Sequence, residues 1–131
     1  MIGYVTIGAK DSEASGKFYD AVFTALGDER KFADGGWIGY GKAGPDKGFT
    51  GCHTMLCNPH DGKEARGGNG IMVAFTAPSQ DAVMAAYEGG IANGGTDEGK
   101  PGFRPPGATA GFFGAYLRDP TGNKICVFNV S

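Results

Sequence analysis

The sequence predicts an α+β fold of two tandem β-α-β-β-β modules, and three observations support this prediction. The two halves of the chain match without a gap over a strand, a helix start, a helix and a helix end. Three shorter apolar segments follow each helix pattern, as expected for strands. A length of 131 residues fits one domain. We expect a first module at about residues 1–57, a connection at about 58–69 and a second module at about 70–131.

The internal repeat begins with two short strands, Tyr4–Ile7 and Met72–Phe75, which both contain β-branched and aromatic residues. A helix start follows each strand, at Asp11–Glu13 and at Ser79–Asp81. At both places a short side-chain oxygen can cap free backbone N–H groups, and an acidic residue stands in the first turn, where it favours the helix dipole.

Both predicted helices carry one apolar stripe and end at glycine. The stripe of the first helix contains Phe18, Tyr19, Val22, Phe23 and Leu26. The stripe of the second helix contains Val83, Tyr87 and Ile91. Gly27 ends the first helix and Asn93–Gly95 ends the second, since glycine accepts the left-handed conformation that closes a helix.

Three strands are predicted after each helix. Their approximate positions are Arg30–Ala33, Trp37–Tyr40 and Gly51–Leu56 in the first half, and Thr96–Gly99, Phe112–Leu117 and Lys124–Val130 in the second. The 25 glycines punctuate these segments without a low-complexity period, so they indicate turns and strand ends.

Charge, hydropathy and cysteine content exclude several classes of function. A net charge of −2 with dispersed charges argues against a nucleic-acid partner. No apolar run approaches the ~20 residues of a membrane span, so we expect no membrane partner. Cys52, Cys57 and Cys126 are odd in number and lack zinc-site spacing, which favours reduced thiols and a cytoplasmic location.

The segments "GNGIMVAFTAPS", "GGTDEGKPGFRP" and "GAYLRDPTGNKICVF" resemble the glyoxalase, bleomycin-resistance and extradiol-dioxygenase (vicinal oxygen chelate) superfamily, in particular its short lactoylglutathione-lyase-like subgroup. The resemblance covers nearly the whole chain. It implies that the two modules form an open, cup-shaped mixed sheet around a small-molecule ligand, and that the protein is a homodimer. Asp119–Lys124 is the most specific match, and the residues themselves predict a turn there.

The resemblance also identifies the positions where metal-dependent members carry ligands. They fall at Tyr4, Met72 and Cys126, and none of these is a histidine or a carboxylate. A phenol, a thioether and a thiol form a poor donor set for a divalent metal. We therefore expect no metal and no cofactor. His53 lies on the predicted fourth strand, another source of family ligands, and its orientation is left open.

Two classes of function remain. One is a small-molecule-binding protein with a metal-free cup; the other is a lactoylglutathione-lyase-like or dioxygenase-like enzyme with an atypical or absent metal site. For an enzyme, Tyr4 and Cys126 are the candidate catalytic residues, as an acid or oxyanion donor and a nucleophile. The candidate cavity residues are Tyr4, Trp37, His53, Met72, Arg104, Phe113, Tyr116 and Cys126.

Arg104 lies between prolines in the predicted loop "PGFRPP" and has two interpretations. Its guanidinium can clamp a carboxylate or phosphate through two parallel hydrogen bonds. A surface ion pair with Asp97 or Glu98 explains the residue as well. Strand alternation also predicts that Phe113 and Tyr116 face opposite sides of their sheet.

Overall fold

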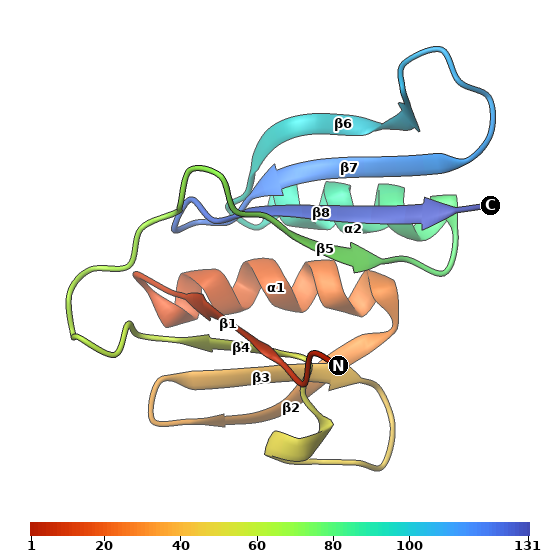
Figure 1. Cartoon of the computed structure of the whole chain (residues 1–131). Coiled ribbons are helices and arrows are strands. Elements are labelled where there is room, and N and C mark those ends of the chain that lie inside the picture. The colour runs from red at the N-terminus through yellow and green to blue at the C-terminus, as the bar shows by residue number, and fades with distance from the viewer.

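The computed structural model describes residues 1–131 and confirms the α+β fold of two β-α-β-β-β modules. The first sheet has the strand order β1-β4-β3-β2 and the second β5-β8-β7-β6, and both are open. Figure 1 shows α1 between the two sheets and α2 behind β7 and β8. The elements are β1 (Val5–Gly8), α1 (Ser12–Leu26), β2 (Asp28–Asp34), β3 (Trp37–Lys42), the 3-10 turn η1 (Phe49–Gly51), β4 (Thr54–Cys57), β5 (Val73–Thr76), α2 (Gln80–Ala92), β6 (Thr96–Arg104), β7 (Phe112–Arg118) and β8 (Lys124–Val130).

The predicted helix caps are present. The Asp11 carboxylate accepts hydrogen bonds from the backbone N–H groups of Glu13 and Ala14, and the Ser79 hydroxyl accepts one from Ala82. Gly27 ends α1 with a φ of 89°, in the left-handed region that disfavours other residues. The two helix starts therefore use the same physical device in both modules.

The core lies between the helices and the sheets, and it corrects one prediction. In α1 the predicted stripe is buried apart from Leu26, which is partly buried. In α2 the buried residues are Val83, Ala86 and Gly90, whereas Ile91 is 39% exposed. The two helices pack closely, and a Cβ added at Gly90 would lie 3.0 Å from the Phe18 ring. Val83 and the partly buried Tyr87 of the predicted stripe therefore pack on the core, whereas Ile91 does not, and Ala86 and Gly90 are buried in addition.

Two predicted strands have different bounds. Gly51 belongs to η1, and β4 begins only at Thr54. The strand predicted at 96–99 continues through Pro101 to Arg104, because irregularities in the pairing with β7 accommodate the proline. Arg104 is therefore the last residue of a strand rather than part of a loop.

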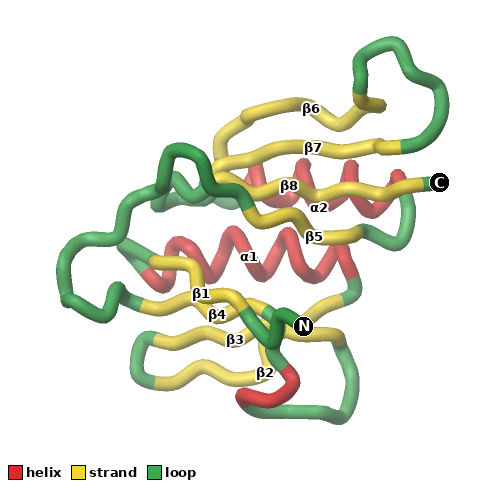
Figure 2. The backbone as a smooth tube through the Cα atoms, viewed as in Figure 1, coloured by secondary structure: helices red, strands yellow, loops and turns green.

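β1 and β5 are the sheet edges that border the seam between the modules. Residues 58–72 connect the modules without a helix or strand, as the green segment between β4 and β5 in Figure 2 shows. The Asn123 side chain donates a hydrogen bond to the Gly8 carbonyl across the seam. A cavity of about 660 Å³ opens at the seam beside the end of α1.

Neither helix is long and apolar enough to span a membrane.

The turn between β7 and β8 is confirmed, and Asp119 organises it. One carboxylate oxygen accepts three hydrogen bonds, each 2.9 Å long, from the backbone N–H groups of Thr121, Gly122 and Asn123. The other oxygen accepts a 2.7 Å bond from the Tyr19 hydroxyl of α1. Asp119 is 4% exposed. This carboxylate therefore joins the second module to the helix of the first.

Candidate functional site

The second sheet has one face under the helices and one open face. Ala115, Leu117, Ile125 and Val127 belong to the helix-covered core. Because side chains alternate along a strand, Tyr116 and Cys126 point to the opposite face. Cys126 pairs with Tyr116 on β7 and with Ala74 on β5, so the three residues form one row across the sheet. We call this surface the open face of the second sheet: Ala74, Arg104, Tyr116, Lys124 and Cys126.

Arg104 reaches this row from the end of β6. Its guanidinium carbon lies 5.5 Å from the centroid of the Tyr116 ring, and its N–H groups donate to the backbone carbonyls of Phe103 and Lys100. Gly99 and Gly102 provide the space, because an added Cβ would lie 3.4 Å and 3.1 Å from the guanidinium nitrogens. The guanidinium is therefore held in place by backbone and ring contacts.

The predicted alternative for Arg104, an ion pair with Asp97 or Glu98, is wrong. Glu98 instead pairs with Arg118 at 2.6 Å. Asp97 accepts hydrogen bonds from the Tyr87 hydroxyl and the Gly99 N–H group. Arg104 consequently has no carboxylate partner.

Lys124 is a site residue that the sequence reasoning missed. Its ammonium lies 5.6 Å from the centroid of the same Tyr116 ring. The signal was its position two residues before Cys126 in a strand, which places both side chains on one face. Arg104 and Lys124 therefore bring two cations to one aromatic ring.

The Cys126 thiol is not an activated nucleophile. Burial raises the pKa of this thiol, although the neighbouring Tyr116 hydroxyl and the charges of Arg104 and Lys124 act in the opposite direction. The residue is 1% exposed. Thiolate chemistry requires a lowered pKa and access to the substrate. Neither condition holds here, so the geometry does not support Cys126 as the predicted nucleophile.

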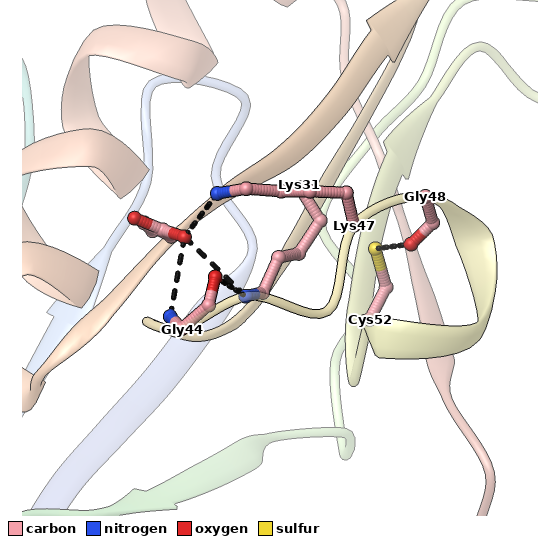
Figure 3. Close-up of polar contacts among 6 residues, drawn as sticks. Lys31, Gly44, Lys47, Gly48 and Cys52 are labelled. Carbon is pink, nitrogen blue, oxygen red and sulfur yellow. Dashed lines mark hydrogen bonds and ion pairs between the residues drawn. The ribbon is translucent and has the colours of Figure 1, made fainter.

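On the first sheet, a carboxylate anchors the loop between β3 and β4. The carboxylate belongs to Glu29. Figure 3 shows the amines of Lys31 and Lys47 and the N–H group of Gly44 directed at this carboxylate. These hydrogen bonds, with Lys47 the largest contributor, lower the pKa of Glu29 to about 2. The loop and its 3-10 turn η1 are thereby held against the sheet.

Tyr4 and Trp37 lie at opposite ends of the first sheet. Tyr4 precedes β1 and packs edge-on against the Phe49 ring of η1, with ring centroids 4.9 Å apart. Trp37 begins β3, where it pairs with Asp34. Tyr4 is 45% exposed and Trp37 is 40% exposed. The structure therefore does not bring these two predicted cavity residues together.

His53 and Phe113 lie on the helix side of their sheets. The Phe113 ring packs against Phe103 and the core, and Tyr116 faces away from it as predicted. The His53 ring lies 5.3 Å from the Phe23 ring of α1. His53 Nε2 lies 3.1 Å from an Asp28 carboxylate oxygen, at the seam cavity. The predicted cavity residues thus divide between different surfaces.

The resemblance assigned metal-ligand positions to Tyr4, Met72 and Cys126, and these residues lie in different surroundings. Met72 and residues of β1 line a cavity of about 90 Å³ at the seam, whereas Cys126 pairs with Tyr116 in the second sheet and Tyr4 packs against η1. No three His, Cys, Asp or Glu side chains lie close enough together to hold an ion. This donor set does not fit a divalent metal.

Comparisons with known proteins agree with this architecture. The Glyoxalase/Bleomycin resistance protein/Dioxygenase superfamily matches residues 1–127. The chain belongs to this superfamily. Among solved structures, a glyoxalase/bleomycin resistance protein from Albidiferax ferrireducens T118 is 37% identical, with a TM-score of 0.82 and 98% of each chain covered. No curated protein matches the chain.

More distant structures share the superfamily fold. A lactoylglutathione lyase from Agrobacterium tumefaciens is 23% identical, with a TM-score of 0.61, and the match covers 98% of this chain and 92% of that one. A glyoxalase/bleomycin resistance protein/dioxygenase family enzyme from Burkholderia phytofirmans PsJN is 21% identical, with a TM-score of 0.69 and coverage of 99% and 98%. At these identities the likeness establishes the fold alone.

Proposed function

We propose that this superfamily member binds a small molecule on the open face of its second sheet and does so without a metal ion. One observation carries the proposal: Tyr116, Arg104 and Lys124 converge on that face. The positions to which the resemblance assigns metal ligands are Tyr4, Met72 and Cys126, and none of them carries an imidazole or a carboxylate. Binding sites commonly combine aromatic walls with a few placed polar groups. The residues support recognition of a ligand rather than Lewis-acid catalysis.

We also propose that the protein is a homodimer, in which a second copy of the chain covers exposed apolar side chains of the first. Large apolar side chains remain exposed near the seam and on the first sheet, among them Tyr4, Trp37, Phe49, Ile71 and Met72. Such exposure marks interaction surfaces, and unpaired strand edges also favour association. A homodimer would enclose a ligand that a single open sheet leaves in contact with solvent.

A nuclear magnetic resonance screen of small aromatic compounds tests the binding site. We predict that hits shift the backbone amide signals of Ala74, Tyr116 and Cys126, which form one row on the open face. Replacement of the ring in Tyr116→Leu should weaken these hits about tenfold, because aromatic contacts contribute specifically to binding. Hits that shift only the signals around His53 would assign binding to the 660 Å³ seam cavity and contradict the proposal.

A further inference from the structure

We propose that Arg104 and Lys124 form an anion clamp, a pair of cations that holds a carboxylate or phosphate group of the ligand above Tyr116. The inference rests on the proposed function and specifies its ligand class. It follows from the contacts of the two cations, from the charges that surround them and from the glycines beneath the guanidinium.

The first support is that neither cation is neutralised within the chain. Seven ion pairs involve other residues, and Arg104 and Lys124 take part in none of them. Glu98, on the same strand as Arg104, is already paired with Arg118. Two unpaired cations beside one ring create a local positive potential, and an anion bound next to them would lower it.

The second support is that the guanidinium is positioned before any ligand arrives. Hydrogen bonds to the carbonyls of Lys100 and Phe103 fix it, and the Tyr116 ring packs against it. A guanidinium has five N–H donors in a rigid fork, so donors remain free after these two contacts. A fixed fork loses less conformational entropy on binding a carboxylate or phosphate.

The third support is that the apolar and aromatic surroundings suit an organic anion. Lys124 and Arg104 are both half-buried, which weakens competition from water relative to surface cations. The Phe112 and Phe128 rings stack on the same sheet with centroids 5.0 Å apart. The clamp therefore fits the anionic end of a small molecule whose remainder contacts aromatic surface.

The test titrates the full chain with benzoate, phenyl phosphate, inorganic phosphate and neutral benzyl alcohol, and follows the amide signals of Tyr116 and Cys126. We predict that benzoate and phenyl phosphate bind more tightly than benzyl alcohol. Charge-neutralising Arg104→Gln and Lys124→Gln should each weaken the two organic anions by about tenfold or more. Benzyl alcohol binding should not change. Inorganic phosphate shows whether a free anion suffices or an attached organic group is needed.

A matched control is Arg66→Gln, which removes the same charge from an exposed arginine without an ion pair in the connection. Its anion binding should equal that of the wild-type protein. Lys124→Gln separates a loss of binding from a loss of folding, because the Lys124 ammonium makes no hydrogen bond to the backbone. The thermal midpoint of this variant should equal that of the wild-type protein. Arg104→Lys, which keeps the charge but not the fork, should bind organic anions with intermediate affinity.

The clamp is overturned if either Gln variant binds benzoate as tightly as the wild-type protein, or if Arg66→Gln weakens binding equally. Benzyl alcohol binding as tightly as benzoate would overturn the clamp and leave the proposed small-molecule site standing. If no probe, charged or neutral, shifts the open-face signals, both the clamp and the proposed function fail.

Discussion

Asp119→Ala should destabilise the protein by about 3 to 5 kcal/mol, since breaking a buried charged network leaves its partners without acceptors. The substitution removes the acceptor of three backbone N–H groups in the β7–β8 turn and of the Tyr19 hydroxyl. Chemical denaturation measures the loss, and the thermal midpoint should fall by about 10 °C or more.

Two further variants separate the parts of this network. Asp61→Ala is the matched control, because Asp61 also accepts a backbone N–H two residues onward, but in an exposed turn. It should cost less than about 1 kcal/mol. Tyr19→Phe removes only the hydrogen bond from the Tyr19 hydroxyl to Asp119 and should cost about 1 kcal/mol. Equal losses in Asp119→Ala and Asp61→Ala would contradict the role given to the buried carboxylate.

Phe18→Ala should cost about 3 to 5 kcal/mol, the range for removal of a buried aromatic side chain. Phe18 is 0% exposed and belongs to the core cluster. Its ring fills the space that Gly90 and Gly95 leave on the second module, where a Cβ added at either glycine would crowd the ring. The loss should appear in the free energy of unfolding measured with denaturant.

Met84→Ala provides the control for Phe18→Ala. Met84 lies on α2 and is 43% exposed, so its truncation should change stability by no more than about 0.5 kcal/mol. A loss no larger than that of Met84→Ala would mean that the contact of Phe18 with the second module contributes little to the free energy of unfolding.

The local signals of the fold were readable from the sequence because they depend on neighbouring residues. Asp11 and Ser79 cap their helices as predicted, and Gly27 closes the first one. In α2 the prediction was right for Val83 and Tyr87 and wrong for Ile91. It missed Gly90, which carries no hydrophobic side chain but is buried by the approach of Phe18. Hydrophobic periodicity does not detect burial that arises from close backbone approach.

The candidate site was less predictable because it depends on pairing between distant strands. Tyr116 and Cys126 were named from the sequence, but Lys124 was overlooked as an ordinary charged strand residue. Whether Arg104 forms an ion pair depended on where β6 ends and on the ion pair between Glu98 and Arg118. The side to which His53 turns depends on its contacts with Asp28 and Phe23, which no local pattern encodes.

The claim of a metal-free ligand site is tested most directly by metal content. Protein purified without chelators or a metal-binding tag should be subjected to elemental analysis, before and after incubation with Ni²⁺ or Zn²⁺ and desalting. We predict no stoichiometric metal in the wild-type protein. A nickel or zinc ion bound stoichiometrically to the wild-type chain would contradict a metal-free site.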